Sequence, residues 1–108
     1  MNTSTISVDK VITELTGPWQ PRDLVIANDT VVRVARFHGE FPWHTHEEDE
    51  LFLCWDGTIR IEVECREPVT LQRGDMYVVP RGAQHRPVSE NVAHALMIER
   101  PETKQYGN

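Results

Sequence analysis

Residues 39–50 read GEFPWHTHEEDE and bring two histidines and an acidic cluster into one short segment. His44 and His46 are two positions apart, a spacing that places both rings on the same face of an extended strand. Glu50 follows four residues later, and His85 ends a second glycine-containing segment, residues 74–85, which reads GDMYVVPRGAQH. Imidazole and carboxylate groups together favour Zn, Fe, Mn, Ni or Co over Ca or Mg.

The residues around Asp56-Gly57 predict a β-hairpin with a two-residue turn. This turn fixes the register, and the expected cross-strand pairs are Trp55 with Thr58, Cys54 with Ile59, Phe52 with Ile61, and Glu50 with Val63. One face then carries Glu50, Phe52, Cys54, Ile59, Ile61 and Val63. Glu50 therefore points inward, where a carboxylate requires a cation or hydrogen bonds.

The opposite face of this hairpin is also apolar, since it carries Leu51, Leu53 and Trp55. Something should cover these side chains, either the N-terminal helix or a second subunit. On this ground we expect a homodimer.

The rest of the chain predicts an all-β domain with a short helix at its N-terminus. Ser7 can cap a helix that Gly17-Pro18 ends, and its apolar residues recur at helical spacing: Val8, Val11, Ile12 and Leu15. From Leu24 onward, closely spaced strands separated by turn residues favour a barrel or sandwich. The expected organisation is an N-terminal segment at 1–23, a barrel at 24–100 and a polar tail at 101–108.

Composition narrows the expected partners and compartment. The net charge of −6 argues against nucleic acid and anionic membranes, because both require a basic face. No apolar run approaches the roughly 18–20 residues that span a bilayer, and residues 1–10 lack the features of a signal peptide. We expect a cytoplasmic protein in which Cys54 and Cys65 are free thiols.

Residues 39–50, followed by Gly57, resemble the first motif of the cupin superfamily, and residues 74–85 resemble the second. The chain is also similar to the small single-domain cupins described as mannose-6-phosphate isomerase-like. The resemblance implies a double-stranded β-helix, a jelly-roll barrel with one divalent transition metal inside. It also implies that His44, His46 and Glu50 are the first three metal ligands and that His85 is the fourth.

Such a ligand set predicts an open metal site without selecting a reaction. Four protein ligands leave two positions on an octahedral ion, which suits oxygenase, isomerase or lyase chemistry. We expect a metal-dependent enzyme acting on a small polar molecule; the alternatives are a non-catalytic binding or sensing module and a vestigial cupin with a structural metal. No catalytic residue is assigned, although four side chains are candidates for a base or an anion-binding group: His94, Tyr77, Arg33 and Arg36. Trp19 and Trp43 are interpreted as packing residues.

Overall fold

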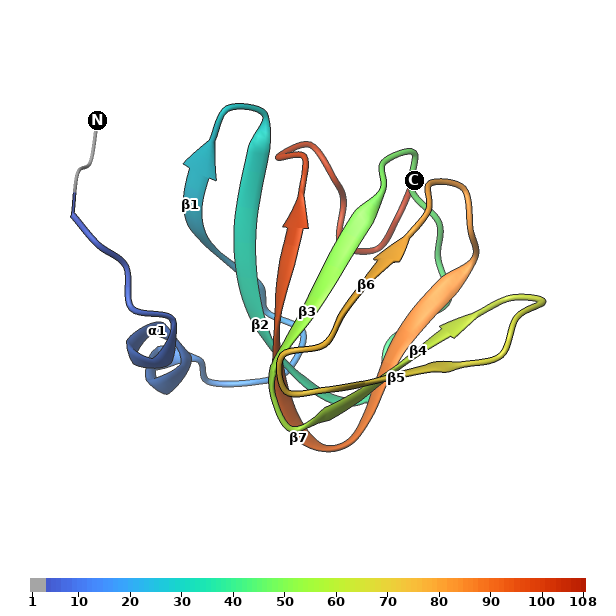
Figure 1. Ribbon diagram of the computed structural model, residues 1–108, viewed down its shortest axis with the longest axis horizontal. Coiled ribbons are helices and arrows are strands. Elements are labelled where there is room, and N and C mark those ends of the chain that lie inside the picture. Colours follow the sequence, from blue (N-terminus) through green and yellow to red (C-terminus); the bar gives the residue numbers. More distant parts are fainter. Residues whose placement is uncertain (1–3) are drawn as a thin grey trace.

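The computed structural model describes residues 4–108 (Figure 1). Its elements are the helix α1 (Val8–Glu14) and the strands β1 (Arg22–Ala27), β2 (Thr30–Glu40), β3 (Glu50–Asp56), β4 (Thr58–Val63), β5 (Val69–Gln72), β6 (Met76–Val79) and β7 (His85–Glu99). The predicted all-β class with one short N-terminal helix is confirmed.

The longest strand, β7, joins the two halves of the barrel. β2 pairs antiparallel with it from Val88 to Glu99. On its other side, its first residues pair with β4 and its last residues pair with β3. The strands β6 and β5 then pair with β3 and β4, respectively. Figure 1 shows β4 and β5 turning away from the β1-β2-β7-β3-β6 arrangement, so that the sheet folds over its own interior. This is the jelly-roll barrel that the resemblance of the two motifs implies.

The prediction of a hairpin around Asp56-Gly57 is wrong, because β3 and β4 do not pair with each other. β3 and β4 form one bent strand rather than a pair, because both run antiparallel to the same neighbour, with Leu51 opposite Ile98 and Val63 opposite His85. Gly57 is the corner of this bend, with a φ of 75°. An Asp-Gly pair provides positive φ for such a corner as readily as for a type I′ turn, so the local sequence does not distinguish them.

The residues predicted to point inward do so despite the wrong pairing. Phe52, Cys54, Ile59, Ile61 and Val63 are buried, and Glu50 is 7% exposed. The corner shifts the strand alternation by one residue, as a two-residue turn would, so the same side chains reach the interior. They join the core cluster with residues of β2 and β7: Ala35, Phe37, Ala93, Ala95 and Met97.

The helix α1 covers part of the outer face. As predicted, Ser7 caps it, and the Ser7 hydroxyl accepts a hydrogen bond from the Lys10 N–H at 3.2 Å. The Trp55 indole donates a hydrogen bond to Asp9 of this helix at 2.7 Å. The N-terminal helix is therefore one cover for the apolar face that contains Trp55.

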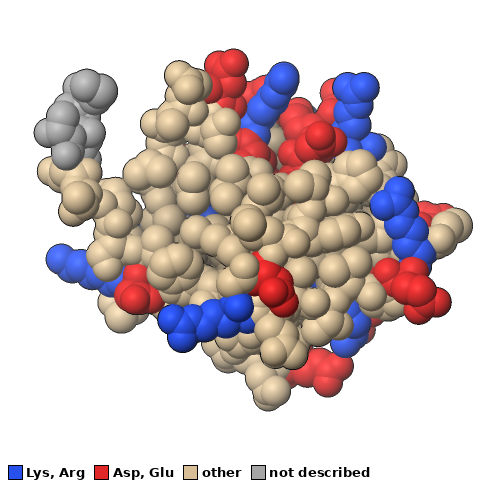
Figure 2. Space-filling view, viewed as in Figure 1, with Lys and Arg blue, Asp and Glu red and all other residues tan. Residues whose placement is uncertain are grey.

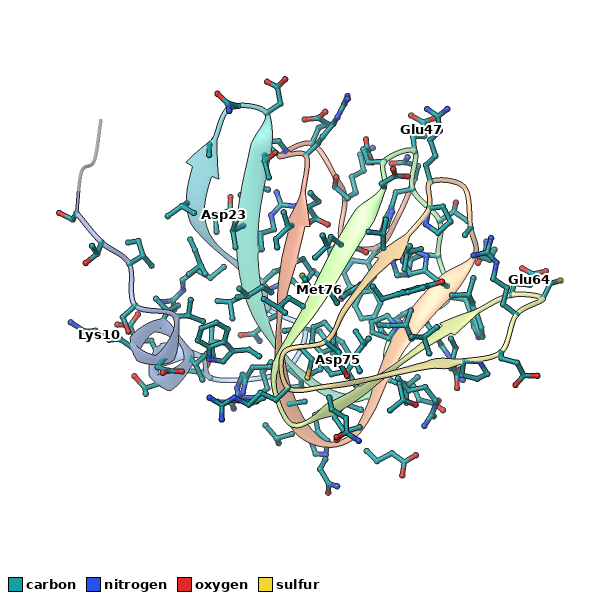
Figure 3. All side chains as sticks on the ribbon, viewed as in Figure 1. Lys10, Asp23, Glu47, Glu64, Asp75 and Met76 are labelled. Atoms are coloured by element: carbon teal, nitrogen blue, oxygen red, sulfur yellow. The ribbon has the colours of Figure 1, made fainter. Side chains whose placement is uncertain are left out.

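The face viewed in Figure 2 has charged side chains mainly around its edge and uncharged atoms over its middle. Four well-exposed apolar residues lie on the outer strands β1 and β6: Val25, Ile26, Met76 and Val78. Met76, labelled in Figure 3, is 64% exposed. Among the described residues, no helix has the length and apolar character needed to cross a membrane.

Candidate metal centre

The structure brings His44, His46, Glu50 and His85 together inside the barrel. One nitrogen or oxygen atom from each side chain lies within 4.8 Å of the others, and all four residues are buried. Glu50 begins β3 and His85 begins β7, while His44 and His46 lie in the connection from β2 to β3. His44 joins the barrel through an isolated bridge to His85, so the two motifs meet through their backbones.

Two of the imidazoles are oriented by backbone carbonyl groups. The Nδ1 atom of His44 lies 2.8 Å from the Pro42 carbonyl oxygen, and that of His85 lies 2.9 Å from the Ala83 carbonyl oxygen. Because a carbonyl only accepts, each Nδ1 carries the proton and donates it. In the neutral ring Nε2 is then the unprotonated nitrogen, which is the form that ligates a metal.

The buried nitrogens of the cluster lack partners of their own. Nε2 of His46 and Nε2 of His85 make no hydrogen bond, although they lie 3.4 and 3.5 Å from Oε1 of Glu50. An unsatisfied buried polar atom is costly, and native proteins rarely retain one without a ligand or an ordered water. A cation placed among these atoms would satisfy them, so the donor set fits a metal ion.

The protonation states also suit a cation. Burial, with the neighbouring imidazoles, lowers the pKa of His44 to about 4, so this ring is neutral at pH 7. Burial alone would raise the pKa of Glu50, but the imidazoles of His46 and His85 outweigh it and hold that pKa below its ordinary value. The cluster therefore offers an ionised carboxylate and at least one neutral imidazole.

A second carboxyl group, on Glu99, lies against Glu50 and was missed by the sequence reasoning. Burial and the Glu50 charge raise the pKa of Glu99 to about 9, so Glu99 is protonated at pH 7. Oε2 of Glu99 also accepts a hydrogen bond from Arg33 at 2.5 Å. The signal was the strand alternation of β7, which places Glu99 on the inward face with Ala95 and Met97.

A cavity of about 290 Å³ reaches the cluster from one side. Its lining includes His44 and Glu50 but not His46 or His85, which lie deeper in the barrel. The rest of the wall includes four aromatic residues, Trp19, Phe37, Phe41 and Phe52, beside other apolar and polar side chains. An ion held by the four residues would therefore face this cavity.

Of the four candidates for a base or an anion-binding group, the structure places one at the cavity and three elsewhere. Only Arg33 lines the cavity. Arg36 donates to the Leu15 carbonyl oxygen at 3.0 Å, on the side of the N-terminal segment. His94 bonds through Nδ1 to Asp56 at 2.8 Å, and Tyr77 packs against the core.

The C-terminal segment closes over the His44 side of the cavity. The Asn108 N–H donates to the Thr45 carbonyl oxygen at 2.9 Å, and the Tyr106 ring stacks on Phe41 with centroids 4.8 Å apart. Gln105 donates to the Trp19 carbonyl oxygen at 2.8 Å. Figure 1 shows the C-terminus beside the connection that leads into β3.

Comparison with known families identifies the barrel. The family model described as a cupin domain matches residues 30–99, which include both motifs and all four clustered residues. The chain belongs to the cupin family. A cupin-2 domain protein from Shewanella frigidimarina has a similar structure, with a TM-score of 0.84, 32% identity, and coverage of 88% of this chain and 93% of the other.

Two further cupin comparisons show how far the likeness extends. The uncharacterized protein YdbB of Bacillus subtilis is 40% identical over 60 residues, which are 55% of this chain and 53% of YdbB, so the match spans about half of that relative. A hydroquinone 1,2-dioxygenase chain from Sphingomonas has a TM-score of 0.80 at 20% identity, covering 94% of this cupin and 75% of the dioxygenase chain. At that identity the likeness concerns the fold alone.

Proposed function

We propose that His44, His46, Glu50 and His85 hold one divalent transition-metal ion (Zn, Fe, Mn, Ni or Co) and that this cupin is a metal-dependent enzyme acting on a small polar molecule. The observation that carries the proposal is the cavity, which reaches the cluster at His44 and Glu50. A purely structural metal would not need a route from solvent to its ligands. Three neutral imidazoles and one carboxylate would leave the ion a formal charge of +1.

A bound divalent ion would polarise an oxygen atom of a substrate or acidify a bound water. The chain's own residues orient the donor groups. The Pro42 and Ala83 carbonyls orient two imidazoles, and Glu99, which accepts from Arg33, raises the local negative potential beside Glu50 when ionised. The aromatic residues of the wall place apolar surface beside these polar groups. This arrangement supports oxygenase, isomerase and lyase chemistry alike, so the narrower mannose-6-phosphate isomerase-like resemblance stays a prediction.

A binding or sensing module is the second candidate, and one observation favours it. Among the described residues that line the cavity, there is no lysine, cysteine, serine or tyrosine to act as a nucleophile. Arg33 and Glu99 are bound to each other. A cupin that binds its ligand without turnover requires none of these groups.

Elemental analysis followed by a turnover screen distinguishes the candidates. We expect about one transition-metal ion per chain, and consumption of a compound from a small-metabolite mixture that stops on chelation and resumes on adding the metal back. NMR spectra of the mixture before and after incubation provide the readout. A ligand that binds the metal-loaded protein and is recovered unchanged contradicts the enzyme and supports the binding module.

We also propose a homodimer. The support is the exposed apolar surface on β1 and β6, where Ile26 is 65% exposed and Met76 is 64% exposed. Multi-angle light scattering at micromolar concentration should give twice the chain mass, and a monomer would refute the dimer.

A reducing compartment, the cytoplasm, is proposed from the thiols. Cys54 is buried and Cys65 is exposed, and neither is in a disulfide. An exposed free thiol is common where glutathione keeps cysteines reduced. Thiol titration of the freshly isolated native protein should therefore find Cys65 unmodified.

A further inference from the structure

We propose that the cavity beside the metal cluster binds a planar aromatic ring that carries a hydroxyl group, a ligand of the phenol class. The inference rests on the proposed function, because it names the kind of molecule that the same cavity would present to the metal. Its support comes from the walls of the cavity, from the backbone of Trp19 and from one unpartnered hydroxyl.

The aromatic residues of the cavity form a continuous wall that leads to the metal cluster. The Trp19 ring lies 4.8 Å from Phe37 and 5.0 Å from Phe41, measured between centroids. Phe41 in turn contacts the His44 imidazole at 5.2 Å, and Phe52 meets Phe37 edge-on at 6.2 Å. Aromatic surfaces favour a flat partner, since stacked and edge-to-face pairs gain more than their buried area alone.

Trp19 is held in this wall by an unusual backbone. Its φ of 61° lies in the left-handed region, where a bulky residue is rare and strained. Two hydrogen bonds maintain it: the Trp19 N–H donates to the Arg36 carbonyl oxygen at 2.9 Å, and its carbonyl accepts from Gln105. Strain of this kind gathers at ligand-binding sites, where the surrounding structure maintains it for a purpose.

The polar side of the cavity offers a hydroxyl partner, and its one cationic side chain, Arg33, is already engaged. Arg33 donates to Asp23, Glu99 and two backbone carbonyls, so its guanidinium is already engaged. Thr103 is 6% exposed, lines the cavity, and its Oγ1 has no hydrogen-bond partner. A ligand hydroxyl would satisfy Thr103, whereas a carboxylate or phosphate would find no free arginine or lysine on this wall.

The size of the cavity limits the ligand to about one substituted ring. A buried cavity of about 150 Å³ accommodates benzene in an engineered lysozyme. The 290 Å³ here leaves room for one ring, its substituents and a bound water.

Calorimetric titration of the zinc-loaded full chain tests the proposal, because zinc supports binding without redox chemistry. The probes are phenol, cyclohexanol and anisole, which share a six-membered ring but differ in planarity or in the hydroxyl. We expect phenol to bind about tenfold more tightly than cyclohexanol, and more tightly than anisole. Equal affinity for phenol and cyclohexanol, or no binding of phenol, would overturn the proposal.

Variants locate the binding. Trp19→Leu should weaken phenol binding at least about fivefold, and Trp43→Leu serves as the matched control because Trp43 is 47% exposed and lies outside the cavity lining. Thr103→Val should weaken phenol binding about threefold to tenfold and weaken anisole binding less, because the anisole oxygen can only accept a hydrogen bond. If Trp19→Leu fails to fold, Phe41→Leu replaces it. Unchanged phenol affinity in the folded wall variant would refute the proposal.

The outcome is separable from that of the proposed function. A protein that binds one metal ion and turns over another class of compound, without binding phenol, keeps the function and refutes the ligand class. A protein that binds phenol at Trp19 but loses no activity on chelation keeps the ligand class and refutes the metal-dependent enzyme.

Discussion

His44 and His85 exchange two backbone hydrogen bonds, each N–H donating to the carbonyl oxygen of the other residue at 3.0 Å. This reciprocal pair fastens the first histidine motif to the start of β7 and sets the two imidazole centroids 4.3 Å apart. The backbone pair therefore holds the two histidine segments side by side, with both rings on the cluster. Such preorganisation reduces the free-energy cost of binding a metal.

His85→Ala should reduce metal affinity by at least about 100-fold, because it removes a proposed ligand while the backbone pair to His44 can persist. Competition with a chromophoric chelator measures the affinity. His38→Ala is the control, since His38 is exposed and lies outside the cluster. An equal loss in the His38 variant would refute the ligand assignment.

Glu99→Gln should change how the stability of the metal-free protein depends on pH. The folded protein keeps a proton on Glu99 up to a pKa of about 9, whereas the unfolded chain loses it above about 4.5. The wild-type contribution is therefore present below pH 4.5 and is lost as pH rises towards 9. A glutamine is neutral throughout, so the variant should lose less stability between about pH 5 and pH 8.

Denaturant unfolding with a chelator present provides the measurement for Glu99→Gln. Glu102→Gln is the matched control, because Glu102 is exposed, and its pH profile should follow the wild type. Parallel profiles for wild type and the Glu99 variant would show that Glu99 is ionised in the folded protein.

Gly57→Ala should destabilise the barrel by about 2–4 kcal/mol. The new Cβ would overlap β7, and the alanine would have to adopt a positive φ. That Cβ would lie 2.7 Å from the Ala93 Cβ and 2.9 Å from its Cα. Gly74→Ala is the control: its φ is 88°, and an added Cβ there meets nothing within 4 Å. It should cost only about 1–2 kcal/mol in equilibrium unfolding. Equal losses would contradict the close approach of the corner to β7.

Gly107→Ala should loosen the C-terminal segment over the cavity. The added Cβ would overlap the Thr45 carbonyl oxygen, so the hydrogen bond from Asn108 could not persist unshifted. We expect faster removal of the metal by a chelator, followed by stopped-flow absorbance. Gly39→Ala is the control, because Gly39 also has a φ of 86° but an added Cβ there meets nothing within 4 Å. The rate of metal removal from this variant should match the wild type. Identical rates for both variants would argue that the segment does not limit access.

The parts of the fold that depend on local pattern could be predicted from the sequence, and the pairing of strands could not. Period-2 alternation identified Glu50, Phe52 and Cys54 as inward-facing whether Gly57 was a turn or a corner. The partner of β3 depended on contacts with residues more than forty positions away, such as Ile98. No local signal specifies that choice.

The same division holds for the site. His44, His46, Glu50 and His85 stand in recognisable motifs, and the structure brings them together. Trp19 and Glu99 belong to no motif and reach the cavity only because the N-terminal segment and β7 fold against β2. Their roles depend on tertiary packing, so the residues of the cavity wall could not be predicted from the spacing of residues in the sequence.

The length of β7 links the cluster to the order of folding. His85 stands at its first residue and Glu99 at its last, while Glu50 lies on a neighbouring strand. The donor set is incomplete until this late segment has been synthesised and paired, and pairings of such large sequence separation form slowly. Metal binding would therefore occur only after the barrel is complete. A nascent chain that ends before His85 would lack one of the four donors and could not bind the ion fully.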